Sequence, residues 1–226
     1  MTSDELLASL EQDIEWRDGE LLELRRKLTS DESPLARGSR RAMVPMVQSH
    51  AEGFVRFALR AYLRYISAQG PSCRNVREVH VAWMLTKEFN RIRVTSVDSG
   101  FELTGIDDDN KRAKQHYSET KLLETLGPLL DQQLVLDDSP LDQFDQNLNK
   151  PYLLAILYHC GLDPVPHSSY GSKLNGLVIR RNQIAHGEST SASIEEIDGW
   201  LITLRTLFQS LRDEVFRHAA SSMYLK

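Results

Sequence analysis

The chain has 226 residues, of which 41% are hydrophobic and 26% charged, and its formal net charge is −5. This composition is typical of a globular protein that buries a core without covalent staples, and the length suits a single domain, residues 1–226. The negative charge argues against a broad, nonspecific nucleic-acid surface, which would be basic, although it permits a local basic pocket. No apolar run approaches the roughly 20 residues of a membrane span, so we expect no membrane association.

The cysteines and the N-terminal residues indicate the cellular compartment in which the protein is expected. The two cysteines, Cys73 and Cys160, lie far apart in the sequence and do not form a disulfide framework, which suits a reducing cytoplasm. Residues 1–5 are acidic and lack the basic flank of a signal peptide. His159 and His167 flank Cys160 without the spacing of a zinc site, so we expect no metal and no cofactor.

Hydrophobic periodicity predicts long helices over residues 3–28 and 37–68 and a further helix over 73–93. Short β-branched stretches between 93 and 103 then suggest a small hairpin or an irregular segment, and 107–110 is a polar turn. Shorter helices are expected at 112–126 and 150–160. The middle of the chain, about 94–150, is therefore interpreted as a partly irregular insertion.

The C-terminal part carries the clearest local signals. One helix is expected over 172–186, ended by Gly187 in a left-handed cap. A capping box, Ser193 to Glu196, then begins the last helix. Together these elements predict an all-α, antiparallel helical bundle. The three tryptophans fall at apolar positions and are expected in its core: Trp16, Trp83 and Trp200.

A helical wheel of residues 172–186 places a cation on an apolar face. Arg181 falls within an arc of roughly 120°, with Asn182 and His186 at its edge, whereas Arg180 and Gln183 face away. The arc itself is apolar: Leu174, Leu177, Val178, Ile184 and Ala185. Because a buried arginine is costly unless it is paired, we expect a carboxylate, a partner subunit or an anionic ligand beside Arg181.

The same segment resembles a known superfamily. Arg181-Asn182 and His186-Gly187, near the C-terminus and followed by one last helix, look like the HEPN signature. Residues 13–24 resemble the first helix of the MAE-type and RiboL-PSP-type HEPN-like nucleases. Residues 50–55, His-Ala-Glu-Gly-Phe-Val, are similar to a run in their second helix. The resemblance covers both ends of the chain, and no resemblance is found for residues of about 75–150.

The resemblance implies a metal-independent endoribonuclease of the toxin or phage-defence class, acting on RNA and sometimes neutralised by an antitoxin protein. It also implies a homodimer in which the helices carrying Arg181 and His186 meet at one cleft. His186 would act as base or acid, Arg181 would hold phosphate oxygens, and Asn182 would orient His186 or donate to phosphate. Arg180 would be a supporting cation.

Other interpretations remain open. Arg181 can pair with Glu52 or another core carboxylate while His186 caps its helix, and Glu52 can equally be a surface residue at a helix crossing. Arginine clusters such as Arg40-Arg41 and Arg180-Arg181 can meet phosphate or can lie on solvated helix faces. The whole protein can also be a catalytically inactive HEPN module that binds RNA, nucleotide or a partner protein, or a plain helical scaffold.

Overall fold

The computed structural model describes residues 1–93, 111–141 and 147–226, and within them it contains α-helices and short 3-10 turns but no strand. The prediction of an all-α bundle is therefore confirmed. The α-helices are α1 (Ser3–Arg26), α2 (Pro34–Gln69), α3 (Glu78–Met84), α4 (Thr86–Arg93), α5 (Lys111–Leu130), α6 (Lys150–His159), α7 (Gly171–Ala185) and α8 (Ile194–Ala220). The expected hairpin near 93–103 and the turn at 107–110 lie outside the described residues.

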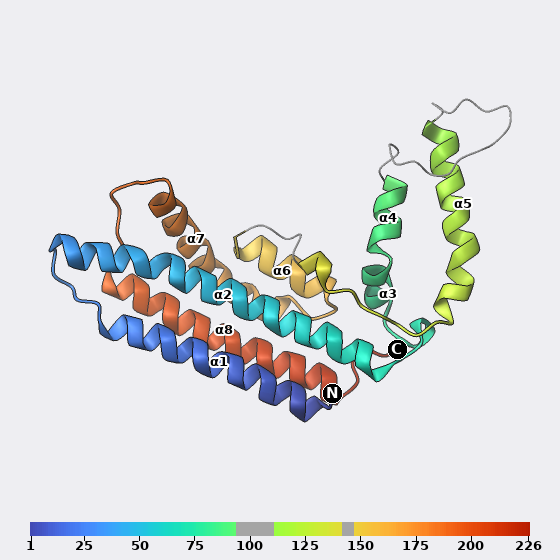
Figure 1. Ribbon diagram of the computed structural model, residues 1–226, viewed down its shortest axis with the longest axis horizontal. Coiled ribbons are helices and arrows are strands. Elements are labelled where there is room, and N and C mark those ends of the chain that lie inside the picture. The colour runs from blue at the N-terminus through green and yellow to red at the C-terminus, as the bar shows by residue number, and fades with distance from the viewer. Residues whose placement is uncertain (94–110, 142–146) are drawn as a thin grey trace.

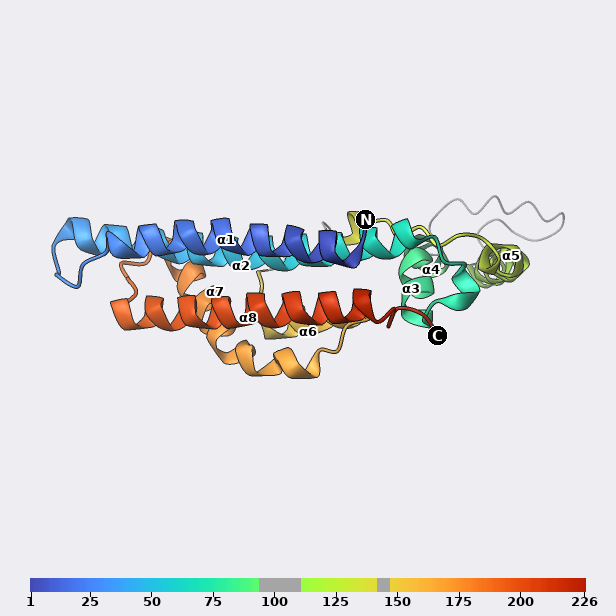
Figure 2. The same cartoon turned by 90° about the horizontal axis from the view of Figure 1, so that it is seen from below.

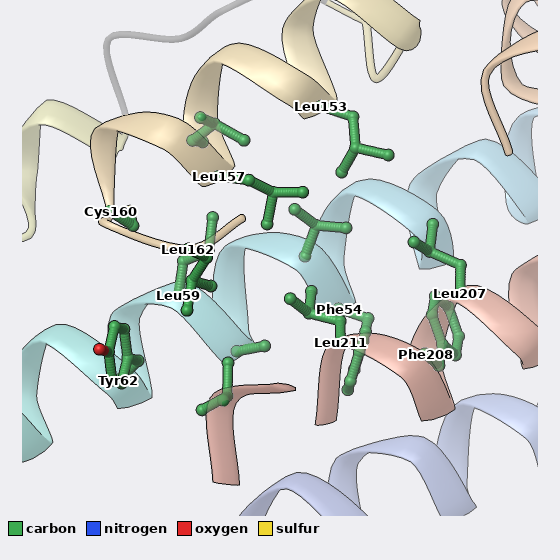
Figure 3. Close-up of a cluster of buried hydrophobic side chains, with 14 of the residues drawn as sticks. Phe54, Leu59, Tyr62, Leu153, Leu157, Cys160, Leu162, Leu207, Phe208 and Leu211 are labelled. Atoms are coloured by element: carbon green, nitrogen blue, oxygen red, sulfur yellow. The ribbon is translucent and has the colours of Figure 1, made fainter. Parts of the chain in front are cut away.

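Three long helices form the frame of the molecule. α1, α2 and α8 pack against one another, and α1 runs antiparallel to the other two, whereas α8 runs in the same direction as α2 (Figures 1 and 2). α6 also runs in the same direction as α2 (Figure 3). After the 3-10 turn η3 (Val165–Tyr170), α7 carries the chain back along α2, so that α8 again runs in the direction of α2 (Figure 1).

The core fills the space between the long helices and α6 (Figure 3). Phe54 of α2 and Phe208 of α8 are fully buried, and their ring centroids lie 4.4 Å apart. Leu153 and Leu157 add the contribution of α6. Each such side chain contributes about 1.5–3 kcal/mol by leaving water, which explains why the bundle holds together without disulfides. Both cysteines are free and buried.

The helix ends follow the local sequence signals. The capping box at Ser193 and Glu196 is present, since each side chain accepts a hydrogen bond from the backbone N–H of the other residue. α2 begins at Pro34 after the cap Ser33 and ends at Gly70, which has φ +65°. Pro45 lies inside α2 and neither begins nor ends it.

An arm made of α3, α4 and α5 projects from one end of the bundle, with α4 and α5 side by side (Figure 1). No residue of α5 is buried. The base of the arm is tied down by backbone pairing, in which the N–H of Leu134 donates to the carbonyl of Pro71 at 2.8 Å. Two helices of the arm, α3 and α4, lie before residue 94, although the insertion was expected to start at about that residue.

The expected single helix over 73–93 is wrong, because the chain is extended at Val76 and forms a bridge with Leu225. The N–H of Arg77 also donates to the carbonyl of Tyr224 at 3.0 Å. The C-terminal residues therefore pair with the base of the arm. This long-range pairing divides the segment into a 3-10 turn (Cys73–Asn75) and the helices α3 and α4.

The tryptophans divide between the core and the surface. Trp83 and Trp200 are 6% and 5% exposed, as expected for core residues. The expectation for Trp16 is wrong, because this side chain is 49% exposed. Its indole N–H donates to Asp13 at 2.9 Å, and the Arg17 guanidinium lies 4.5 Å from its ring centroid. A polar and cationic environment of this kind stabilises an indole at the surface.

A group of buried histidines lies where α3 meets α8. His80 is fully buried, and neither of its ring nitrogens has a hydrogen-bond partner. The ring packs against Tyr62, and a Cβ placed on Gly161 would lie 2.8 Å from it. His218 of α8 faces the other side of Tyr62, with Nδ1 3.4 Å from the hydroxyl. The base of the arm is therefore packed over a fully buried imidazole.

Within the described part of the chain, no helix combines the length and apolar character that crossing a membrane requires.

Candidate active site at the end of α7

The C-terminal end of α7 is open although the rest of its inner face is packed. Leu174, Leu177 and Val178 are buried, whereas Arg181 is half-buried and Ala185, on the same side, is exposed. In the last turn Ile184 still packs against the core, whereas Ala185 and the cap residue His186 are exposed. Arg181 therefore lies at the edge of the packed region, where a second molecule can reach it.

Arg181 has no carboxylate partner among the described residues. Its guanidinium donates to Oδ1 of Asn182 at 3.1 Å, and no ion pair is formed with an acidic side chain of residues 1–93, 111–141 or 147–226. An amide oxygen does not neutralise a guanidinium. The Asn182 side chain therefore contacts Arg181, and no carboxylate among the described residues balances the positive charge of the guanidinium.

His186 is exposed and occupies the C-cap position of α7. The next two residues form a Schellman motif, in which the N–H of Gly187 donates to Ile184 at 3.1 Å and the N–H of Glu188 donates to Gln183 at 3.0 Å. Gly187 has φ +83°, a conformation that glycine adopts at little cost, so the predicted helix stop is confirmed. The motif holds the backbone of His186 while its imidazole faces solvent.

Arg180 has a structural role in the junction between α7 and α8. Its guanidinium donates to Glu196 at 2.7 Å and also to the hydroxyl of Thr190. The helical wheel places Arg180 away from the apolar arc of α7, and its flexible side chain nevertheless reaches α8. Burial raises the pKa of Glu196, but the hydrogen bonds from Ser193 and Arg180 outweigh burial and hold the pKa below its usual value.

Arg41 of α2 holds the loop that follows His186. Its guanidinium donates to the carbonyl of Thr190 at 2.6 Å and to that of Glu188. The neighbouring Arg40 is buried and donates to the carbonyls of Thr29 and Asp31, at 2.7 and 2.8 Å. Both arginines therefore donate hydrogen bonds to backbone carbonyls, a role that the sequence pattern alone did not reveal.

Glu52 is not brought to Arg181. Its Oε1 accepts hydrogen bonds from the amide of Gln48 at 2.7 Å and from the backbone N–H of Leu148 at 3.0 Å. The carboxylate therefore fixes α2 to the segment before α6, and the interpretation that it pairs with Arg181 is not supported by these contacts. Of the residues singled out in the sequence, Arg181, Asn182 and His186 share one helix end, with Arg180 beside them.

Among the described residues, no group of three or more histidine, cysteine, aspartate or glutamate side chains is arranged to hold a metal ion. The side chains at the end of α7 offer a guanidinium, an amide and an imidazole.

A helical bundle whose penultimate helix ends in Arg181-Asn182 and His186, followed by one long last helix, has the architecture of a HEPN-type module. The family model for MAE_28990-like HEPN matches residues 6–224, and the chain belongs to this family. The match spans the arm as well as the bundle. No curated protein and no solved structure gives a significant match.

Proposed function

We propose that the protein is a metal-independent endoribonuclease whose active site is completed in a homodimer through α7. One observation carries the proposal: Arg181 and His186 lie together at an uncovered helix end, and the guanidinium has no carboxylate partner among the described residues. The HEPN family membership supports the assignment, since HEPN modules are often ribonucleases.

The side chains fit the chemistry of RNA cleavage. An imidazole with a pKa near neutrality can remove the proton of the ribose 2′-hydroxyl, and the 2′-oxygen then attacks phosphorus. The bond from phosphorus to the 5′-oxygen breaks, which leaves a 2′,3′-cyclic phosphate and a 5′-hydroxyl. The guanidinium of Arg181 stabilises the charge that develops on the nonbridging oxygens. The leaving 5′-oxygen needs a proton, which the second copy of His186 would supply.

Two features of α7 support the proposed dimer. Its inner arc becomes exposed at Ala185, so a second copy can pack there without displacing the bundle. Each chain offers one imidazole at this site, whereas the reaction uses a base and an acid. A twofold arrangement presents the same patch from both subunits and supplies both groups. RNA is the proposed ligand of the completed cleft.

The test is cleavage of single-stranded RNA by the purified protein in the presence of a chelator. We expect cleavage, with a cyclic phosphate on one product and a hydroxyl on the other. An RNA with one 2′-deoxy residue at the cleaved position should resist, because the nucleophile is missing. Arg181→Lys should lower the rate by about tenfold or more, since an ammonium cannot form the planar fork.

Cleavage of the 2′-deoxy substrate, or activity that the chelator abolishes, would contradict the mechanism. Binding of RNA without cleavage would instead favour the second candidate, an inactive HEPN module that binds RNA, nucleotide or a partner protein. We also propose that the nuclease acts in the cytoplasm as a toxin or defence component, regulated by an antitoxin protein. Growth arrest on expression is the consequence expected of that role.

A further inference from the structure

An open groove runs along α7 next to the proposed active site. It encloses about 380 Å³ between α7 and α8, and Lys173, Gly176, Arg180 and Gln183 lie along its α7 side. Trp200 and Glu196 form the α8 side. From Ser172 to Gln183 the groove follows about 16 Å of helix, at 1.5 Å per residue. Its far end is one turn before His186, so the groove leads to the end of α7.

The charges of the groove favour an anion. Arg180 is already occupied by Glu196, at 2.7 Å. Lys173 is exposed and forms no ion pair within the described part of the chain; its ammonium lies beside the backbone of α8, 3.5 Å from the position of a Cβ on Gly199. One acidic and two basic side chains therefore leave a net positive charge at the end of the groove away from His186.

The surface between the charges suits a nucleobase. Ile179 is 60% exposed, although it lies on a helix of the bundle, and Gln183 offers an amide beside it. Gly176 opens the middle of the groove, because a Cβ placed on it would have no atom within 4 Å. Glycine is unfavourable in the interior of a helix, and no close packing in this structure requires it at this position.

We propose that this groove binds the single-stranded RNA segment next to the scissile phosphodiester. In this arrangement Lys173 contacts a backbone phosphate, and a base lies over Ile179 and Gln183, so that one cationic contact is combined with one apolar contact. The inference rests on the proposed ribonuclease function. It adds that substrates long enough to reach Lys173 bind more tightly than those that occupy only the end of α7.

The test compares three variants at one position, Gly176→Ala, Gly176→Gln and Gly176→Glu, on two substrates. The dinucleotide occupies only the cleavage position, whereas a single-stranded oligoribonucleotide also enters the groove. Glutamine and glutamate fill the same space, so they differ in charge alone. We expect Gly176→Glu to raise KM for the oligoribonucleotide about tenfold relative to Gly176→Gln, with kcat unchanged. On the dinucleotide all three variants should equal the parent protein.

Lys173→Gln provides a second measurement, made in a His186→Ala background so that the RNA is not consumed. The slope of log Kd against log salt should fall by about 0.7, the value expected for one lost phosphate contact to a single strand. Because Gly176 is surrounded by open space and glycine is unfavourable in a helix interior, its variants should unfold at the temperature of the parent protein or above it.

The groove proposal fails if Gly176→Glu and Gly176→Gln behave alike on the oligoribonucleotide, or if the salt slope is unchanged in Lys173→Gln. It also fails if Gly176→Glu impairs the dinucleotide as strongly as the longer RNA. A parent protein that cleaves neither substrate contradicts the ribonuclease function itself. The two failures are therefore distinguishable.

Discussion

Replacing His186 with alanine is expected to lower the rate of RNA cleavage by about 100- to 10,000-fold, the usual contribution of general acid–base catalysis. The effect should fall on kcat rather than on KM, because the imidazole moves protons and contributes little to holding the RNA. Its ring is exposed, and its backbone is held by the Schellman motif, so removing the ring leaves the fold intact. Single-turnover cleavage of labelled RNA measures the loss.

The matched control is His116→Ala, since the side chain of His116 is 83% exposed on α5, away from α7. This variant should cleave RNA like the parent protein. The same pair of variants tests the proposed role in cells: growth arrest on expression should be relieved by His186→Ala and retained by His116→Ala. Full cleavage by His186→Ala would reject the catalytic assignment of this residue.

Acid should destabilise the bundle through His80. Burial lowers the pKa of this imidazole from 6.5 to about 4, and the nearby charges of Arg77 and His218 act in the same direction. The unfolded chain binds a proton below about pH 6.5, whereas the folded chain does so only near pH 4. The free energy of unfolding therefore falls as the pH decreases between these values, by about 3 kcal/mol in total. Urea unfolding at a series of pH values measures this loss.

The groups around His80 are consistent with a lowered pKa of its imidazole. Tyr62 from α2 and the backbone at Gly161 face the ring, and no carboxylate among the described residues contacts it. His218 also has a lowered pKa, chiefly because of burial, and adds to the effect. His80→Leu should remove about 3 kcal/mol of the acid dependence, whereas His116→Leu should leave it unchanged. An unaltered pH profile in His80→Leu would contradict this explanation.

Local sequence patterns predicted the features that depend on neighbouring residues. The long helices, the stop at Gly187 and the capping box at Ser193 and Glu196 all arise from spacing and backbone conformation within a few residues. The expectation of a charged helix end at Arg181 and His186 has the same local origin, because both residues belong to one helical turn and its cap.

Features that depend on distant residues were not predictable in this way. The bridge between Val76 and Leu225 interrupts the expected helix over 73–93, and nothing local identifies its partner. The sequence suggested that Glu52 pairs with Arg181. In the structure the Glu52 carboxylate instead accepts a hydrogen bond from the backbone N–H of Leu148, which is distant in the sequence. The groove likewise depends on α7 and α8 packing with Gly176 facing open space, which periodicity does not describe.

We propose that two subunits share one anion-binding cleft at the exposed ends of their α7 helices. Crosslinking of Ala185→Cys with a short bifunctional maleimide tests it most directly, since the natural cysteines, Cys73 and Cys160, are both buried. We predict a covalent dimer for Ala185→Cys and none for Leu123→Cys, whose position is 70% exposed on the arm. A monomer in solution, with neither cysteine variant crosslinked, would contradict the claim.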